Sequence, residues 1–591
     1  MKQFQIAYHN ENAFREELEN IRQWCDTHPA YTTLFRIFSP DLALIQQICN
    51  FLDEHMPDAL YVGCTSHANM VNGALNSAPA MLTCTVFEYE TTQVKLLQFP
   101  FTEENEKEVV QKLQAYCEKN PWVTSVEMYA TILGMSVREF CDEMSALRRD
   151  IQVFGGGACN PVLSDITTYV VSSGNGVSSH GIVFLLCGGS DFHTYSTYVS
   201  GWTPLRRKFK VTKAYRDLLY ELDGVPAFRV YQRFLNIENN EDLILNTLDF
   251  PILMDHKGVD VMRCIMLANE DGSISLTSEI EEGADIRLSY GDPEMILANI
   301  RHDGQHIADF QPDAVQAFSC GARKAFWGDD NISDETMLFQ NVAPTSGFYT
   351  GGEFLRIGGI MHHFNCTLVL AAMREGEPKT GEIKSLYDAS LDEKHSKRIA
   401  LIQRFISFIE ASTADFEESN RKLEELNRRL AHASITDGMT GLYNRTEIER
   451  EIINALSTNN DGNVSLIMMD LDNFKKVNDI HGHKEGDNVI IALADVLRNV
   501  LGHMASAHIG RWGGEEFMVL LTDSDMDEAA AYAEQIRRSF AAMEFEAAPS
   551  QTVSIGVSQA RPGDSCDTLC SRVDKALYTA KANGKNQVVQ L

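Results

Sequence analysis

One segment near the middle of the chain constrains the architecture most strongly. The residues from Leu391 to about Ala433 contain neither Gly nor Pro, and charges of both signs are mixed along them, which predicts one long helix. Apolar and small polar side chains recur along this segment at alternating steps of three and four, namely Ile399, Ile402, Ile406, Ile409, Thr413, Phe416, Asn420, Leu423, Asn427 and Leu430. This spacing is the heptad pattern of a coiled coil.

The polar members of this pattern indicate how the helix associates. Thr413, Asn420 and Asn427 occupy the later a positions, and a buried Asn pairs best with its own copy in two parallel strands. We therefore predict a parallel homodimer through a coiled-coil helix at residues 391–433. The alternative is an amphipathic helix packed on a neighbouring domain, but three polar a positions would make a poor seam there.

The linker helix separates two regions of different pattern. Before it, residues 1–378 alternate short apolar runs such as Gly181 to Cys187 with glycine clusters, which predicts a mixed α and β region. Gly155-Gly-Gly157 predicts a tight turn in a sheet, because no Lys or helix cap completes a phosphate loop. After it, residues 434–591 alternate helical patterns with four apolar strands. We expect a multi-domain α+β protein whose last domain has a mainly antiparallel sheet surrounded by helices.

Charge and cysteine content exclude several classes of protein. The chain of 591 residues carries a formal net charge of −32, which repels polyanions, so we expect no nucleic-acid partner. The thirteen cysteines lack the paired C-x2-C spacing of a zinc site and predict reduced thiols. The N-terminus is polar, and no apolar run approaches the ~20 residues that span a bilayer. We therefore expect a cytoplasmic protein with no membrane partner.

Carboxylates gather at two points of the last domain. An apolar strand ends at Asp470, and Gly513-Gly514-Glu515-Glu516 lies between two apolar strands, which predicts a hairpin with a Gly-Gly turn. If these strands are neighbours, Asp470 and Glu515 converge and repel unless a cation lies between them. Oxygen ligands without nearby His or Cys favour Mg2+. A strand-end Asp and an acidic hairpin are each common alone, but the combination is not.

The motifs that carry a resemblance extend over the whole last domain. They are Asp437-Gly-Met-Thr-Gly-Leu-Tyr-Asn-Arg445, Asp470-Leu-Asp-Asn-Phe-Lys475, Asn478-Asp479, Gly482-His483, Gly486-Asp487 and Gly513-Gly-Glu-Glu-Phe517. Together they resemble the GGDEF diguanylate cyclase domain, and place it at residues 434–591. The resemblance implies the joining of two GTP into cyclic di-GMP with release of two pyrophosphates, each domain of a dimer holding one GTP.

The resemblance also implies roles for particular residues. Two Mg2+ or Mn2+ ions per half-site would be held by Asp470, Glu515 and the carbonyl of Leu471, with Glu516 assisting in catalysis. The substrate would be held by residues that read guanine or bind phosphates, namely Asn478, Asp487, Asn473, Phe474, Lys475, Lys581 and Lys585. Relatives with product inhibition carry Arg-x-x-Asp where this chain has Met504-Ala-Ser-Ala507, so we expect no such inhibitory site here.

Looser motifs mark the region before the linker. They are Gly63-Cys-Thr-Ser66, Gly155-Gly-Gly-Ala158, Gly201-Trp-Thr-Pro204, Leu222-Asp-Gly224, Phe318-Ser-Cys320, Gly347-Phe-Tyr-Thr-Gly-Gly-Glu353 and His363-Phe-Asn-Cys-Thr367. They resemble paired FIST sensory domains, which we place at residues 1–200 and 201–378. The resemblance implies a small-molecule ligand, an amino acid being one candidate. The candidate pocket residues are Arg323, Tyr349, Glu353, His363 and Asn365, although the same side chains could instead cap strands and turns.

These observations favour a signal-responsive diguanylate cyclase in which a ligand of the first region regulates the cyclase through the coiled coil. Two alternatives stay open. The last domain could bind GTP or cyclic di-GMP without turnover, or the chain could be a dimeric scaffold that binds no nucleotide.

Overall fold

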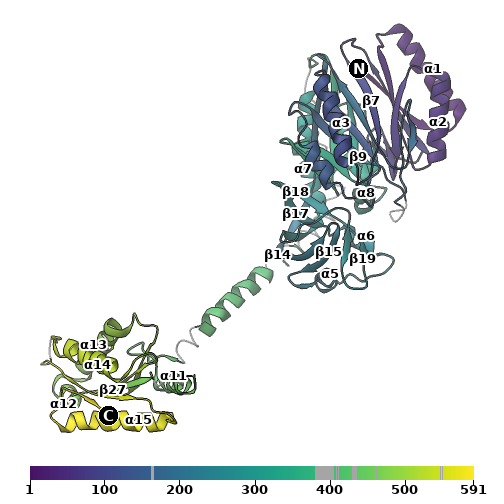
Figure 1. Ribbon diagram of the computed structural model, residues 1–591. Coiled ribbons are helices and arrows are strands. Elements are labelled where there is room, and N and C mark those ends of the chain that lie inside the picture. Colours follow the sequence, from purple (N-terminus) through teal and green to yellow (C-terminus); the bar gives the residue numbers. More distant parts are fainter. Residues whose placement is uncertain are drawn as a thin grey trace. The chain divides into compact units, whose positions relative to one another are not determined.

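The computed structural model describes residues 1–161, 166–379, 386, 405–406, 409, 412–428, 435–458, 463–545, 548 and 550–591. The chain divides into two compact units, residues 1–408 and 409–591. Figure 1 shows the elements of both units. Within the described residues, no helix is long and apolar enough to cross a membrane.

The first sheet of the first unit is covered by two helices. Its order is β1 (Lys2–Tyr8), β6 (Ala80–Phe87), β2 (Thr32–Ser39), β3 (Leu60–Thr65), β10 (Val170–Ser172) and β11 (Gly176–Ser178). Helices α1 (Glu11–Thr27) and α2 (Leu42–His55) pack on one face, because Phe14, Leu18, Ile45 and Ile48 belong to the same buried cluster as that face. This is the period-3.6 apolar stripe that an amphipathic helix presents to a sheet.

Two further sheets draw strands from distant parts of the chain. The second sheet runs β25 (Ile360–Phe364), β24 (Glu353–Ile357), β9 (Gln152–Gly157), β8 (Val123–Ala130), β12 (Gly181–Gly188) and β7 (Gln93–Pro100). The third runs β13 (Phe192–Val199), β26 (Leu368–Glu375), β22 (Ala314–Cys320), β23 (Thr345–Thr350), β4 (Ala68–Val71) and β5 (Ala74–Asn76). The apolar run predicted at Gly181 to Cys187 forms the buried strand β12.

These pairings interleave the two regions that the sequence motifs separate. Strand β24 pairs with β9, and β4 pairs with β23, so each of the two sheets contains strands from both sides of residue 200. The predicted boundary at 200/201 therefore does not divide the first unit into two sets of independent sheets.

The fourth sheet lies within residues 202–291. Its order is β18 (Val259–Arg263), β17 (Ile252–His256), β21 (Asp285–Gly291), β14 (Trp202–Tyr215), β15 (Leu218–Leu222), β20 (Ile274–Leu276) and β19 (Ile265–Ala268), with β16 (Val225–Pro226) paired to β15. The remaining helices of this unit are α3 (Glu106–Lys119), α4 (Arg138–Met144), α5 (Ala227–Leu235), α6 (Leu243–Leu248), α7 (Pro293–Phe310), α8 (Gly321–Trp327), η1 (Ile332–Glu335) and α9 (Met337–Gln340).

The triple glycine has a different role from the predicted one. Gly155 to Gly157 form the end of strand β9 and not a turn. A Cβ atom on Gly156 would lie 2.6 Å from Cγ2 of Thr350, and one on Gly155 would lie 2.1 Å from the carbonyl oxygen of Met128. The glycines are needed because β9 runs too close to its neighbours for any side chain. The prediction of a turn was wrong.

The second unit is built on one five-stranded sheet. Its order is β28 (Ala507–Gly513), β29 (Glu516–Leu521), β27 (Ser465–Leu471), β30 (Val553–Gln559) and β31 (Val588–Gln590). All pairs are antiparallel except β30 with β31, so the predicted mainly antiparallel sheet is confirmed.

Helices cover both faces of this sheet. One apolar cluster joins it to α12 (Phe474–His481), α13 (His483–Leu501) and α14 (Met526–Ala541), and another joins it to α11 (Arg445–Thr458) and α15 (Cys566–Ala582). With this, the predicted multi-domain α+β fold class is confirmed.

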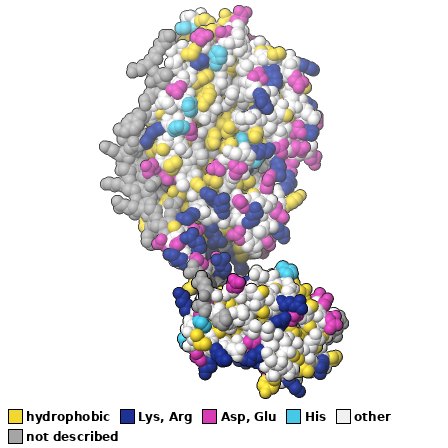
Figure 2. Space-filling view, turned by 90° about the vertical axis from the view of Figure 1, so that its left-hand side faces the viewer, with side chains coloured by type: hydrophobic (Ala, Val, Ile, Leu, Met, Phe, Trp, Pro, Cys, Tyr) yellow, Lys and Arg dark blue, Asp and Glu magenta, His cyan; other side chains and the backbone are white. Residues whose placement is uncertain are grey.

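The described part of the predicted linker is helical. Residues 412–428 form a helix, whereas Ile399, Ile402 and Leu430 of the heptad pattern lie outside the described residues. Three other members of the pattern expose their apolar side chains: Ile409 by 53%, Phe416 by 66% and Leu423 by 55%. Figure 2 shows both acidic and basic side chains on the face that it draws.

Candidate active site

A buried strand carries the first carboxylate to its end. All seven residues of β27 are buried, and Asp470 lies opposite Glu516 of β29 and Ser554 of β30. The strand is central and flanked on both sides, which fixes the position of Asp470 at the end of the sheet. The structure thus brings Asp470 and the β28–β29 hairpin together, as the apolar strand pattern indicates.

The hairpin turn differs by one residue from the predicted Gly-Gly turn. Gly513 ends β28 and pairs with Glu516, so Gly514 and Glu515 form the two-residue turn. Gly514 has a φ of +47°, which glycine adopts without strain. Glu515 is therefore carried at the tip of the turn, and its carbonyl oxygen accepts from the N–H of Leu471 at 3.4 Å.

One arginine ties this turn to the start of the domain. Arg511 donates to the carbonyl oxygen of Gly514 from Nε at 3.0 Å and from Nη2 at 2.7 Å, and its Nη1 lies 3.2 Å from Oδ1 of Asp437. Asp437 also accepts from the backbone N–H of Thr440 at 2.9 Å. The turn that carries Glu515 is held in place by side chains outside it, a contact that the sequence motifs alone do not show.

Three carboxylates at this corner destabilise one another's charged form. Burial raises the pKa of Asp470 above its ordinary value, and the neighbouring Lys581 ammonium, 2.6 Å from Oδ2, only partly opposes this. Burial, followed by the charge of Asp470, raises the pKa of Glu515 and of Glu516. A cation bound here would relieve this repulsion, because it favours the ionised form of each group.

The donor set fits a hard divalent ion. Asp470 and Glu515 offer carboxylate oxygens and Leu471 offers a carbonyl. Among the described residues, no group of three or more His, Cys, Asp and Glu side chains is arranged to hold a metal. The chain thus supplies only part of a coordination shell, and Mg2+ commonly completes such a shell with water and substrate phosphate oxygens.

The second aspartate of the strand end has a separate role. Asp472 accepts hydrogen bonds from Oγ1 of Thr552 at 2.7 Å, from Oγ of Ser554 at 2.6 Å and from the N–H of Asn586 at 3.0 Å. These bonds join β27 to β30 and to the segment after α15. Asp472 therefore holds the sheet together beside the site instead of facing it.

The start of α12 offers unpaired backbone donors next to this corner. Asn473, the N-cap residue, has a φ of +57°, and the amides of Phe474 and Lys475 in the first turn have no intrahelical acceptor. Nζ of Lys585 donates to Oδ1 of Asn473 at 2.6 Å. The structure thus brings four of the predicted phosphate-binding residues together, at a helix end that suits an anion.

The two predicted guanine-reading residues come from different helices. Asn478 lies on α12 and Asp487 on α13, and both are half-buried. Gly486 makes their approach feasible, because a Cβ atom there would lie 2.0 Å from Oδ1 of Asn478. An amide and a carboxylate side by side can satisfy the donors and acceptors of a purine edge.

The five candidate pocket residues of the first unit fall into two groups. Arg323 is fully buried and forms a two-bond ion pair with Glu335, Nε to Oε2 at 2.9 Å and Nη2 to Oε1 at 2.7 Å. Its Nη1 donates to the carbonyl oxygen of Cys366 at 2.9 Å. This arrangement favours a structural role for Arg323 in place of the predicted ligand contact.

The other four candidates each bury a polar atom that has no hydrogen-bond partner among the described residues. These atoms are the hydroxyl of Tyr349, Oε2 of Glu353, Nε2 of His363 and Nδ2 of Asn365. Burial raises the pKa of Glu353 well above its ordinary value and lowers that of His363 to about 3, which favours the neutral form of each group. Buried polar groups without partners are uncommon in folded proteins and call for bound water or a ligand.

Comparisons with known proteins agree with this geometry. Residues 434–587 match the model of the diguanylate cyclase GGDEF domain, residues 33–225 that of the FIST N domain and residues 227–356 that of the FIST C domain. Diguanylate cyclase DgcM of Escherichia coli is 41% identical over 165 residues, which cover 27% of this chain and 39% of DgcM. Diguanylate cyclase VdcA of Vibrio cholerae is 32% identical over 215 residues, covering 35% of this chain and 60% of VdcA.

Solved structures of GGDEF domains match the same region. The crystal structure of the coiled coil and GGDEF domain of DgcB from Caulobacter crescentus, in complex with c-di-GMP, is 29% identical, covers 31% of this chain and 99% of that chain, and has a TM-score of 0.29. Each match to a curated relative spans only part of that relative's length. The chain thus carries a FIST N domain, a FIST C domain and a C-terminal GGDEF domain, in that order.

Proposed function

We propose that this protein is a diguanylate cyclase whose activity responds to a small molecule bound by its FIST domains. The observation that carries the activity is the corner formed by Asp470, Glu515 and Glu516, whose pKa values are all raised, next to the open amides of α12. The likeness of this domain to two named diguanylate cyclases supports the same activity.

The proposed reaction joins two GTP. Each 3′-hydroxyl oxygen forms a bond to the α-phosphorus of the other nucleotide, two pyrophosphates leave, and the two hydroxyl protons are released. Asp470, Glu515 and the Leu471 carbonyl would hold two Mg2+ or Mn2+ ions, which lower the pKa of the attacking hydroxyl and neutralise phosphate charge. The chain's own contribution is to orient GTP. Asn478 and Asp487 hold the base, while the α12 amides, Lys581 and Lys585 hold the phosphates.

We further propose a parallel homodimer, because one domain holds one GTP and supplies half of the reaction. Ile409, Phe416 and Leu423 of the heptad pattern are largely exposed in the single chain, and packing against a second copy would bury them. Proximity of two bound nucleotides can supply about 7–11 kcal/mol of a reaction barrier in well-oriented systems.

The proposed sensor function is supported by the unpartnered buried atoms of Tyr349, Glu353, His363 and Asn365. A ligand shifts an equilibrium between two dimer arrangements only if it binds one of them more tightly. Such a ligand would change the fraction of dimers in which the two GTP sites face each other. Location in the cytoplasm stays a prediction.

The test of the activity is incubation of purified protein with GTP and Mg2+, with the nucleotides resolved by chromatography. Wild-type protein should form cyclic di-GMP, and Glu515→Gln should form none while keeping its circular dichroism spectrum. Glu544→Gln, the same change at an exposed glutamate of the same domain, is the matched control and should be fully active.

Two other results would favour the alternatives. Binding of GTP without any product would indicate a silent effector. Absence of heat on titration with a nonhydrolysable GTP analogue would indicate a scaffold that binds no nucleotide.

A further inference from the structure

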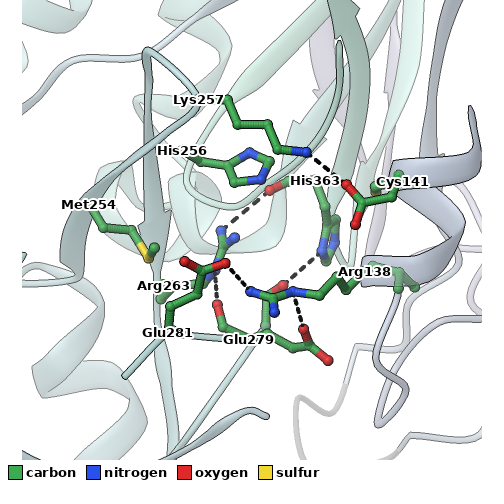
Figure 3. A pocket seen from close by; sticks show the side chains of 12 residues that line it. Arg138, Cys141, Met254, His256, Lys257, Arg263, Glu279, Glu281 and His363 are labelled. Atoms are coloured by element: carbon green, nitrogen blue, oxygen red, sulfur yellow. Dashed lines mark hydrogen bonds and ion pairs between the residues drawn. The ribbon is translucent and has the colours of Figure 1, made fainter. Parts of the chain in front are cut away.

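A cavity of about 140 Å³ lies in the first unit, between α4 and the β17–β18 hairpin. It has room for several water molecules, since a volume of this kind holds a water for each ~10–15 Å³ or more. Figure 3 shows Arg138 entering from α4 on one side and Arg263 from β18 on the other. The charged residues that line it are Arg138, Asp142, Lys257, Arg263, Glu279 and Glu281.

All of these charges except that of Arg263 have an oppositely charged partner. Nε of Arg138 lies 2.8 Å from Oε2 of Glu279, and Arg138 also pairs with Glu281. Nζ of Lys257 lies 2.7 Å from Oδ1 of Asp142.

The two imidazoles that line the cavity cannot serve as counterions of Arg263, because an imidazole is either neutral or positively charged. Burial lowers the pKa of His256, and it lowers that of His363 to about 3, which favours the neutral form of each ring. The lining thus holds three cations and three carboxylates, of which Glu279 and Glu281 share Arg138, and Arg263 is the cation that forms no direct ion pair within the described residues.

Arg263 is nearly buried, at 6% exposure, and its guanidinium is bound only to carbonyl oxygens. Nε donates to Glu279 at 3.1 Å, and Nη1 donates to Met262 at 2.9 Å and to His363 at 3.3 Å. A guanidinium has five N–H donors, so the two on Nη2 remain. Burial lowers the pKa of Arg263 to about 10.

Another buried arginine of the same unit shows what a purely structural guanidinium looks like. Arg356 also lacks a carboxylate partner, but its five donors reach the carbonyl oxygens of Gly359, Arg148, Ile151, Ser145 and Leu147. Arg356 is saturated by the backbone. Arg263 keeps two donors beside a cavity.

We propose that this cavity binds a small monocarboxylate, whose oxygens accept from Nη2 of Arg263 and whose short aliphatic chain contacts Val137 and Met254. Amino acids fit less well, because each carboxylate at the cavity is already paired and offers no site for an ammonium group. The site goes beyond the proposed cyclase activity and does not depend on it. It is lined by α4 of the FIST N match and by β17 and β18 of the FIST C match, so a bound anion would bridge the two.

The test uses the full chain and sodium propionate as the probe, followed by thermal unfolding and by calorimetry. Propionate should raise the unfolding temperature in a saturable way. Sodium chloride at equal ionic strength and the neutral analogue propionamide should not. Alanine, which adds an ammonium group to propionate, should bind about tenfold more weakly or worse.

Two variants with the same loss of charge locate the site. Arg263→Met should weaken propionate binding about tenfold or more, whereas Lys257→Met, at the same cavity, should leave it nearly unchanged. Equal losses in the two variants would overturn the assignment to Arg263. So would equal stabilisation by chloride or propionamide, or tighter binding of alanine. If Arg263→Met does not fold, the comparison of propionate with propionamide on the unaltered chain still decides the charge requirement.

Discussion

Buried charges are paired differently in the carboxylate corner of the GGDEF domain, formed by Asp470, Glu515 and Glu516, and in the core of the FIST domains. In the core, Arg323 and Glu335 neutralise each other completely, and Arg36 and Glu127 do the same, with Nη2 and Oε2 2.7 Å apart. At the corner, three carboxylates lie together, and within the described residues the ion pair found there joins Asp470 to Lys581. The difference teaches that matched charges serve the fold, whereas surplus charge beside open space marks a place for a ligand. The predictions below test this distinction.

The largest effect is expected from breaking a matched pair. Glu335→Gln leaves the guanidinium of Arg323 without a counterion in a fully buried site, which should cost about 3–5 kcal/mol of unfolding free energy. Urea unfolding measures this. Glu534→Gln, which breaks a partly exposed pair with Arg537, is the control and should cost no more than about 1 kcal/mol. Equal losses of unfolding free energy in the two variants would contradict the expectation that breaking a buried pair costs more than breaking an exposed one.

Removing surplus charge should instead affect activity. Asp470→Asn should lower the rate of cyclic di-GMP formation by about 100-fold or more, equivalent to ~2.7 kcal/mol, because a metal-binding oxygen is lost. Its metal-free stability should equal or exceed that of the wild type, since the repulsion is relieved. Thermal unfolding with and without Mg2+ checks both parts, and a large loss of metal-free stability would contradict the proposed role.

Replacing both members of the matched pair should be milder than replacing one. Arg323→Met combined with Glu335→Leu removes both charges and keeps similar volume, so the double variant should lie within about 1–2 kcal/mol of the wild type. The same urea experiment compares it with Glu335→Gln. A double variant with a lower free energy of unfolding than the single variant would show that the pair stabilises the fold by more than the mutual neutralisation of its charges.

The smallest effect is the pH dependence of the metal-free protein. Because the folded-state pKa values of Asp470, Glu515 and Glu516 are raised, the folded state binds protons more readily than the unfolded state, and these groups lower stability as pH rises through their folded pKa values. The unfolding temperature of Glu515→Gln minus that of the wild type should therefore increase as the pH rises above about 4.3, the ordinary pKa of a glutamate. Saturating Mg2+ should abolish that increase.

The sequence predicts the carboxylate corner well because each of its residues lies at the end of a strand or in a hairpin that the apolar pattern identifies. An apolar strand that ends in Asp470 and a hairpin that carries Glu515 determine the arrangement once the strands pair. The turn itself was misplaced by one residue, because the ladder extends to Gly513. The pairing of Arg511 with Asp437 joins residues 74 positions apart and has no local signal.

The sequence predicts the first unit less well, for a related reason. Arg263 donates to the carbonyl oxygens of Glu279 and His363, which lie 16 and 100 positions away in the sequence, and no spacing encodes these contacts. The glycines at 155–157 look like a turn because the same residue type serves turns and close strand contacts. Only the neighbouring Thr350 and Met128 distinguish the two.

The interleaved sheets have a consequence for how the protein is made. Strand β9 ends at residue 157, but its partner β24 begins at residue 353, so the ribosome must add roughly two hundred residues before that edge is covered. During this interval the nascent chain exposes a glycine-rich strand edge that can pair with other chains. We therefore expect proteins truncated near residue 200 to be insoluble. We also expect synthesis of the intact protein to depend on chaperones that cover the edge of β9 until β24 has been made.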